Sequence, residues 1–203
     1  MIGEATLFVV DDDQTVRESL RTLGGSVGLP VEAYPTGEEF LATQNGGRAG
    51  CLVCDVRLPG MSGLDLQQEL ATHGFTLPII MITAYADVSI AVRAMRAGAI
   101  DFIEKPFNRQ VLLDRVHEAI EMDRKVRLLE TQRRSVTAWV ARLTPREREV
   151  MTLVVAGKAN KVIAMDLGLC EKTVEVHRAH AMRKMEAESL AELVRLNVLL
   201  RAE

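Results

Sequence analysis

Two short apolar runs of this sequence end in carboxylates, and these acids are the first candidates for chemistry. Asp11–Asp13 follows the run Thr6–Val10, and Asp55 follows the run Cys51–Cys54. Such runs are typical of β-strands that are covered on both faces. In an open parallel α/β sheet, ligands bind at the carboxyl ends of the strands, where the strand order reverses. If the two strands are neighbours, the repulsion between the acids requires protons, a cation or both, and Mg²⁺ suits such oxygen ligands.

Two more polar residues stand where predicted strands end. Thr83 follows Ile79–Ile82, and Lys105 follows Asp101–Glu104. Taken singly, the Thr is more typical of a turn or helix cap and the Lys of a solvated loop. Four strand ends that converge on one edge favour a site instead. This set suits phosphoryl transfer to an aspartate, because a metal and a lysine neutralise phosphoryl oxygens while a hydroxyl binds a third.

The elements that must position these residues alternate between apolar strands and amphipathic helices. Five strand–helix units follow one another up to about residue 122, which predicts a doubly wound α/β domain with a parallel sheet. Gly24-Gly25 lies inside the first predicted helix, where each Gly costs about 1 kcal/mol relative to Ala. The sequence gives no reason for this pair.

Charge divides the 203-residue chain into two parts. Residues 1–121 contain 9 Lys and Arg against 17 Asp and Glu, a net charge of −8, and residues 122–203 contain 16 against 11, a net of +5. The basic part is the candidate for binding nucleic acid. The sequence has neither a membrane-spanning apolar run nor a secretory signal, so we expect a cytoplasmic protein with no membrane partner.

The pair Cys51-x-x-Cys54 resembles a redox or zinc motif, but a structural role is favoured. Residues three apart on a strand point to opposite faces, and no second Cys/His pair is placed to complete a tetrahedral site. We therefore expect both cysteines to be small buried strand residues.

Four separated motifs, Val10–Asp13, Asp55–Gly63, Thr83-Ala84 and Lys105–Phe107, resemble the signature of the bacterial response-regulator receiver domain. The resemblance covers about residues 5–122. It implies a five-stranded parallel sheet of flavodoxin-like order 2-1-3-4-5.

The same resemblance implies roles for individual residues. Asp55 is the phosphoacceptor, and Asp11 and Asp12 form the acidic metal-site pair, with Asp12 the more direct ligand. The metal is Mg²⁺ (or Mn²⁺), and the backbone carbonyl of Arg57 is a further ligand. The remaining implied roles concern the phosphoryl contacts Thr83 and Lys105, the aromatic switch Phe102, and a cis bond before Pro106. Asp13 has no implied role, and we expect it to cap a helix.

Residues 123–142 form the expected boundary between domains. Charged residues dominate there, and Met122, Val126 and Leu129 fit one helical stripe. We expect a partly helical linker between domains at 1–122 and 143–203. A dimerising coil is less favoured, because fewer than three clean heptads are present.

The last part of the chain predicts four helices. Thr144–Glu147 is a capping-box start, Gly157 ends the first helix, and Asn160 is predicted to cap the second. A tight turn then leads to a third helix over about residues 171–185, followed by a fourth over 188–201. Two short helices with a tight turn, the second of them basic, are typical of a helix-turn-helix unit.

One stripe of the third helix is predicted to face inward and the opposite stripe to face DNA. The inward stripe is Val174, His177, Ala181 and Met185. The outer stripe, predicted to read bases, is Lys172, Glu175, Val176, Ala179 and Arg183. Glu175 is suited to a cytosine amino group and Val176 to a thymine methyl. Phosphate contacts are expected from basic side chains, which position without reading sequence. The full set of predicted DNA-contacting residues is Lys161, Lys172, Thr173, Glu175, Val176, Arg178, Ala179, Arg183 and Lys184.

The motifs Leu143–Val150, Asn160-Lys161 and Thr173–Arg178 resemble the LuxR-type DNA-binding domain, over about residues 140–200. The order receiver, linker and LuxR-type domain is similar to the FixJ/NarL family of transcriptional response regulators, nearer the FixJ subgroup. Cys170 departs from the family, which has Ser at this helix cap. Because Cys is a weak hydrogen-bond acceptor, we expect a weaker cap.

The resemblance implies a regulator and not an enzyme, beyond assistance to its own phosphorylation and dephosphorylation. By this resemblance we expect a sensor histidine kinase to phosphorylate Asp55, and the chain then to form a homodimer that binds double-stranded promoter DNA and contacts RNA polymerase. The alternative from another class is an aspartate-nucleophile phosphohydrolase, for which Asp11-x-Asp13 has the formal spacing. A regulator that dimerises without phosphate is a third reading, which the intact acid cluster disfavours.

Overall fold

The computed structural model describes residues 5–44 and 48–201, and it divides into two compact units, residues 1–126 and 127–203. Each unit is considered by itself. The first contains, in chain order, β1 (Thr6–Val10), α1 (Gln14–Ser26), β2 (Val31–Tyr34), α2 (Gly37–Thr43), β3 (Gly50–Asp55), α3 (Gly63–Thr72), β4 (Ile79–Thr83), α4 (Val88–Arg96), β5 (Asp101–Glu104) and the start of α5 (Arg109–Ala141).

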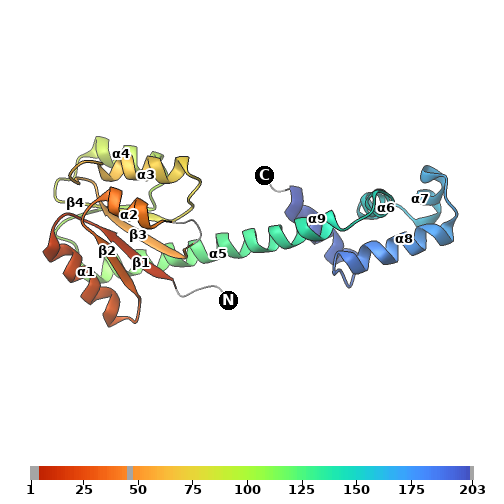
Figure 1. The fold of residues 1–203 in the computed structure, drawn as a ribbon, viewed down its shortest axis with the longest axis horizontal. Helices are drawn as coiled ribbons and strands as arrows, with labels where there is room; N and C mark the ends of the chain where they lie inside the picture. The colour runs from red at the N-terminus through yellow and green to blue at the C-terminus, as the bar shows by residue number, and fades with distance from the viewer. Residues whose placement is uncertain (1–4, 45–47, 202–203) are drawn as a thin grey trace. The chain divides into compact units, whose positions relative to one another are not determined.

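The five strands form one parallel sheet of order β2-β1-β3-β4-β5, which confirms the predicted fold class (Figure 1). Side chains alternate across this sheet, as in any strand. Leu7 and Val9 enter the core that contains side chains of α1 and α5. Phe8 and Val10 enter the core that contains side chains of α2, α3 and α4. The sheet is therefore covered on both faces, which is why its strands read as continuous apolar runs.

The two strand cysteines are structural, as predicted. Cys51 and Cys54 are fully buried, and they belong to the cores on opposite faces of the sheet. Burial raises the pKa of both thiols, which keeps them protonated and unreactive.

Gly24 is explained by the packing of α1 against β2. A Cβ at Gly24 would lie 2.3 Å from Cγ2 of Val31 and 3.2 Å from the carbonyl oxygen of Leu29, so a larger residue does not fit. A Cβ at Gly25 would meet no atom within 4 Å. Close packing therefore requires glycine at position 24 but not at position 25.

Helix α5 continues through most of the expected linker. It runs without a break from Arg109 to Ala141, so this segment is more regular than the partly helical linker that was predicted. Asp123 is 2% exposed and accepts a hydrogen bond from the Gly50 amide at 2.9 Å, at the start of β3. This contact ties the beginning of the linker segment to the first unit. Among the described residues, no helix is both long and apolar enough to cross a membrane.

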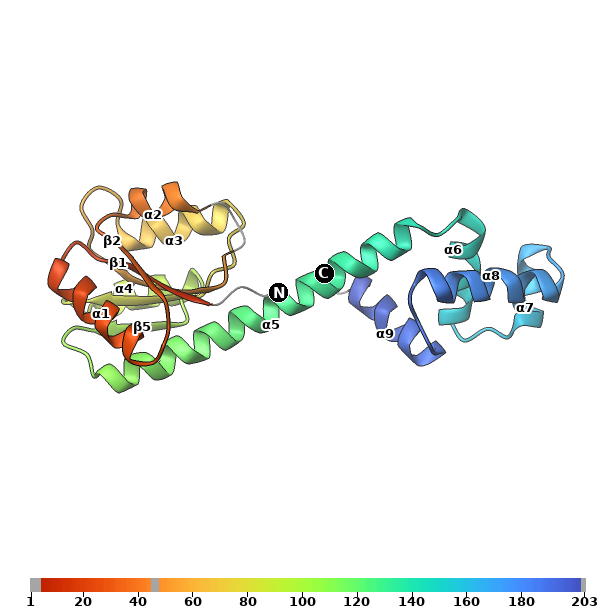
Figure 2. The same ribbon diagram turned by 60° about the horizontal axis from the view of Figure 1, so that its bottom comes forward.

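The second unit contains the end of α5 together with α6 (Pro145–Val155), α7 (Asn160–Leu167), α8 (Glu171–Lys184) and α9 (Leu190–Arg201), as Figure 2 shows. Its core includes Val136 of α5, Val150 of α6, Ile163 of α7 and Val174 of α8. Gly157 and Gly168 end α6 and α7 with positive φ angles of 81° and 66°, which glycine adopts without strain.

One predicted cap is wrong and another is weak, as expected. Ala159, and not Asn160, is the N-cap of α7, and its side chain makes no capping bond. The Asn160 side chain instead accepts a hydrogen bond from Arg178 Nη1 at 3.1 Å, so it is used to join α7 to α8. Cys170 is the N-cap of α8 without a side-chain capping bond to the backbone, and its Sγ lies 2.9 Å from Thr173 Oγ1.

A buried carboxylate joins the start of α6 to the end of α8. Thr144 and Glu147 form the predicted capping box, and the Glu147 carboxylate accepts from the Thr144 amide at 2.8 Å. The same carboxylate accepts from Lys184 Nζ at 2.6 Å and is only 3% exposed. The ammonium of Lys184, followed by the Thr144 amide, lowers the pKa of Glu147 to about 2.

We predict opposite effects for alanine at the two adjacent glycines. Gly24→Ala should lower the free energy of unfolding of the first unit by about 1–3 kcal/mol, because the new methyl group overpacks the contact with β2. Gly25→Ala should raise it by up to about 1 kcal/mol, because the helix gains a better helix former. The urea dependence of Cys51 and Cys54 labelling measures both changes, since these thiols are buried only in the folded unit. Equal shifts for the two variants would contradict the packing argument.

We predict that Glu147→Gln lowers the unfolding free energy of the second unit by about 2 kcal/mol at neutral pH, through loss of charged hydrogen bonds. The pKa of Glu147 is lower in the folded state than in the unfolded state. The ionised carboxylate therefore contributes fully to the unfolding free energy above pH 4.5, and its contribution declines as the pH falls toward 2. Trp139 is the only tryptophan and packs against this core, so its fluorescence during urea unfolding measures the change. Glu149→Gln, which breaks only an exposed pair with Arg146, is the control and should change stability by less than 1 kcal/mol.

Candidate functional site

One ammonium group bridges two acids at the carboxyl edge of the sheet. Strands β1 and β3 are neighbours, so Asp11 and Asp55 lie side by side at their ends. Lys105 Nζ donates to Asp11 Oδ2 at 2.6 Å and to Asp55 Oδ2 at 2.5 Å. Asp11 is fully buried and Asp55 is 6% exposed, so these two carboxylates are largely shielded from water. Three predicted site residues therefore meet in one hydrogen-bonded cluster.

The pKa values in this cluster reflect burial and pairing. Burial raises the pKa of Asp11, although the hydrogen bond and charge of Lys105 oppose this effect. Burial also disfavours the charged form of Lys105, but its bonds to Asp11 and Asp55 outweigh burial and raise its pKa. The lysine is thus held as a cation beside the acids, where it can stabilise further negative charge.

A third acid completes a set of oxygen donors. Asp12 is exposed, and ligand atoms of Asp11, Asp12 and Asp55 all lie within 4.8 Å of one another. Three carboxylates face one ammonium, so the cluster has an excess of negative charge. Hard oxygen donors of this kind fit Mg²⁺ or Mn²⁺. The donor chemistry therefore agrees with the predicted metal site.

The loop after β1 is held by its own hydrogen bonds. Asp13 caps α1 through a 2.7 Å bond from the Thr15 amide, which lowers its pKa, and its own amide donates to Asp11 Oδ1 at 2.9 Å. The described acid cluster thus contains Asp12 and leaves Asp13 as a helix cap. This geometry disfavours the phosphohydrolase alternative, which needs Asp11 and Asp13 together.

Thr83 and Phe102 lie on β4 and β5, the two strands that follow β3 in the sheet. Thr83 is 1% exposed, and its hydroxyl accepts from the Tyr85 amide at 3.3 Å. The Tyr85 ring lies under the guanidinium of Arg57, whose Cζ is 4.6 Å from the ring centroid. Phe102 is half-buried against the core that contains α4. The Lys105–Pro106 bond is cis, as expected.

Helix α4 and the loop before it expose apolar side chains. Tyr85, Val88, Val92 and Met95 are 65%, 82%, 42% and 46% exposed. Contiguous patches of exposed apolar side chains are typical of surfaces that contact another protein. Tyr85 lies only two residues beyond Thr83, so these exposed side chains begin next to a residue of the predicted site in the sequence.

The outer stripe of α8 is exposed as predicted. Its exposed members are Lys172, Glu175, Val176, Ala179 and Arg183. Opposite them, Val174, Ala181 and Met185 are buried in the core of the second unit, and His177 is half-buried. The helix therefore exposes a stripe of charged and small apolar side chains, while its other side packs against the core of the unit.

Two basic residues of the predicted DNA set have partners within the unit. Lys184 was expected to face phosphate, but its ammonium is bonded to the buried Glu147 carboxylate. Arg178 donates to Asn160 Oδ1, as described above. The residue spacing along α8 could not reveal these partners, because Glu147 belongs to α6 and Asn160 to α7. Lys161 and Thr173 lie at the beginnings of α7 and α8, and Lys161 is exposed.

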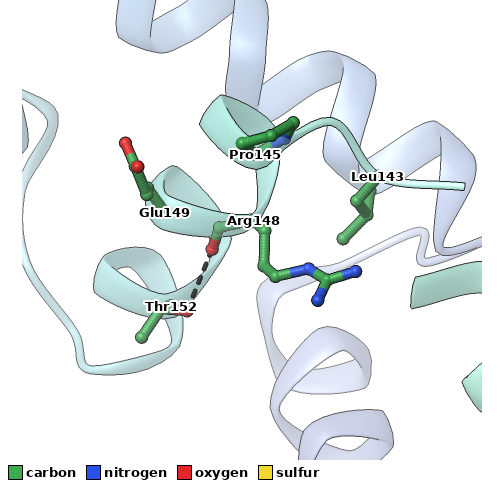
Figure 3. A pocket seen from close by; sticks show the side chains of 5 residues that line it. All are labelled: Leu143, Pro145, Arg148, Glu149 and Thr152. Carbon is green, nitrogen blue, oxygen red and sulfur yellow. Dashed lines mark hydrogen bonds between the residues drawn. The ribbon is translucent and has the colours of Figure 1, made fainter. Parts of the chain in front are cut away.

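A surface pocket lies beside the start of α6, and Figure 3 shows its lining residues Leu143, Pro145, Arg148, Glu149 and Thr152. Arg148 Nη2 donates to the Val140 carbonyl at 3.1 Å, and the Thr152 hydroxyl donates to the Arg148 carbonyl at 2.9 Å. The side chains of Arg148 and Thr152 thus form hydrogen bonds to backbone carbonyls of the same unit, and we assign no chemistry to this pocket.

Sequence reasoning missed Arg17, one turn into α1. Arg17 Nη1 donates to the carbonyl oxygens of Asp11 and Asp12 at 2.7 and 2.9 Å. The available signal was the spacing, since a long basic side chain one turn after the acids can reach back to their backbone.

Comparison with known families supports both halves of this description. Residues 7–117 match the response regulator receiver domain, and residues 141–197 match the bacterial regulatory proteins of the luxR family. The matches cover the acid cluster and the helix with the exposed stripe, respectively. The receiver and LuxR-type resemblances drawn from the motifs are therefore confirmed.

Known relatives match almost the whole chain. Nodulation protein W of Bradyrhizobium diazoefficiens is 47% identical over 96% of this chain and 86% of its own length. The transcriptional regulatory protein FixJ of Azorhizobium caulinodans is 44% identical over 95% of this chain and 92% of its own. The solved structure of the response regulator StyR is 42% identical, with a TM-score of 0.89 over 97% of this chain and 99% of its own.

Full-length FixJ from B. japonicum, also solved, is 38% identical, with a TM-score of 0.60 over 98% of each chain. The shared domain order and the identity along nearly the full length decide the assignment. The chain belongs to the FixJ-type transcriptional response regulators of two-component systems, DNA-binding proteins that join a receiver domain to a LuxR-type domain.

Proposed function

We propose that Asp55 is the phosphoacceptor of this regulator and that a sensor histidine kinase is the donor. The observation that carries this proposal is the bridging of Asp55 and Asp11 by Lys105. A carboxylate oxygen of Asp55 attacks the phosphorus of a phosphohistidine. A P–O bond forms to Asp55, the P–N bond breaks, and the histidine nitrogen leaves with the electron pair and takes up a proton.

Residues around Asp55 would hold the phosphoryl group and a cation. Asp11, Asp12, Asp55 and the backbone carbonyl of Arg57 are the proposed ligands of Mg²⁺ (or Mn²⁺), which when bound neutralises phosphoryl oxygens. Lys105 already contacts Asp55, so a short movement of its side chain brings it to the new group. Because this chemistry ends with one phosphoryl group on the chain, we propose no turnover of external substrates.

The added group would change the surface next to the site. A dianionic phosphoryl group attracts the Thr83 hydroxyl, and we propose that Phe102 moves with it as the switch. The exposed apolar residues of α4 lie shortly after Thr83 in the sequence. We propose that two phosphorylated copies pair through the face formed by α4 and β5, roughly residues 87–103.

The output of this pairing would be promoter binding in the cytoplasm, with contact to RNA polymerase. A dimer matches an inverted or pseudo-palindromic site on double-stranded DNA. On α8, the stripe proposed to face base edges is Lys172, Glu175, Val176, Ala179 and Arg183. Contacts to DNA phosphates are proposed for Lys161, Arg178, Arg183 and Lys184, and Thr173 is a further proposed DNA contact. Lys184 makes the smallest contribution of these, because Glu147 already neutralises it.

We propose that the functional domains are residues 1–122 and 143–203, with residues 123–142 as the connector. The LuxR family match begins at residue 141, close to residue 143, where the second proposed domain begins. Asp123 packs with the first unit, which supports a connector that begins within a helix and not in a loop.

We predict that Asp55→Asn abolishes labelling of the full chain by a small phosphodonor in the presence of Mg²⁺. The amide is a poor nucleophile, and the other acids lie in different positions. Mass spectrometry of the intact protein measures the addition of one phosphoryl group.

Asp13→Asn is the matched control for this test. It removes a neighbouring acid and keeps a good helix cap, so labelling should equal that of the wild type. Equal labelling of Asp55→Asn and the wild type would reject Asp55 as the acceptor. Release of many phosphates per chain from small esters would favour the phosphohydrolase alternative.

A further inference from the structure

Arg17 is the one arginine of α1 that reaches the backbone of the acid loop. It is half-buried, and its Nη1 atom donates to both the Asp11 and the Asp12 carbonyl at 2.7 and 2.9 Å. Two successive carbonyl oxygens therefore turn toward the same guanidinium nitrogen. Hydrogen bonds from a charged donor are about twice as strong as neutral ones, so this pair holds the two peptide groups firmly.

The three acids of the cluster are held to different degrees. Lys105 binds the carboxylates of Asp11 and Asp55, and these also accept bonds from the amides of Asp13 and Arg57. Within the described residues, no hydrogen bond or ion pair holds the Asp12 carboxylate, and Asp12 is exposed. The position of the Asp12 side chain thus depends on its own backbone.

We infer that Arg17 is a positioning residue for the metal site: it fixes the backbone of Asp12 and thereby directs the Asp12 carboxylate toward Asp11 and Asp55. This inference rests on the proposed Mg²⁺ function. Groups that orient metal ligands without touching the metal contribute 10–100-fold to metal affinity. The guanidinium also places a positive charge behind the acids, which reduces the repulsion among them.

Arg21 provides a matched comparison on the same helix. It lies one turn after Arg17 and also donates to a backbone carbonyl, that of Ala33, at 3.2 Å. Its bond leaves the acid loop untouched. Removal of Arg21 therefore changes the net charge by the same amount as removal of Arg17 without releasing Asp12.

The test is the affinity of the full chain for Mg²⁺, measured by titration calorimetry. Arg17→Met should weaken binding by about 10–100-fold. Arg17→Lys, which keeps the charge and donors, should recover part of this loss, and Arg21→Met should stay within about twofold of the wild type. The Mg²⁺ concentration for half-maximal phosphorylation should rise by the same factor in Arg17→Met, while the rate at saturating Mg²⁺ stays near the wild-type value.

The results separate this inference from the proposed function. A wild-type chain that binds no Mg²⁺ overturns the metal site itself. A wild-type chain that binds Mg²⁺, together with an Arg17→Met variant within twofold of it, overturns only the role of Arg17. Equal losses in Arg17→Met and Arg21→Met also overturn it, because they indicate a general disturbance of α1 and not the release of Asp12. If labelling of Cys51 and Cys54 shows that Arg17→Met is unfolded, Arg17→Gln replaces it with the same criterion.

Discussion

Repulsion among carboxylates at one edge of the sheet is the constraint on which the first unit depends. Asp11 and Asp55 are buried, Asp12 lies beside them, and Lys105 supplies one positive charge in their midst. A buried ion pair gains little net stability, because the attraction mainly offsets the cost of taking both charges out of water. We therefore interpret the cluster as a functional feature: a site with excess negative charge, which suits the proposed divalent cation and the proposed phosphorylation of Asp55.

The fold supplies this edge through strand order. Because β3 lies between β1 and β4, the polar residues that end β1, β3 and β4 share one edge, and Lys105 reaches across from the end of β5. In the second unit, too, one charged side chain joins distant segments. The buried carboxylate of Glu147 links the start of α6 to the end of α8. In each unit one buried or half-buried charged side chain thus joins segments that are distant in the sequence, Lys105 in the first and Glu147 in the second.

Much of this arrangement could be predicted from the sequence, because it depends on local signals. Apolar runs that end in Asp55 or Thr83 mark strands and their polar ends, and the capping box at Thr144 marks a helix start. The features that were missed depend on contacts between distant segments. Gly24 is needed because of Val31, Lys184 is neutralised by Glu147, and Asn160 binds Arg178 instead of capping α7. Spacing along one element carries no information about such partners.

The central claim is that chemistry at Asp55 controls DNA binding by the second unit. Its most direct test is the binding of the full chain to a library of genomic promoter fragments at constant salt, with and without a phosphodonor and Mg²⁺. The phosphodonor should tighten binding of the wild type to a small set of fragments by about tenfold or more, and Asp55→Asn should show no such change. Equal binding by the wild type in both conditions would contradict control of DNA binding through Asp55.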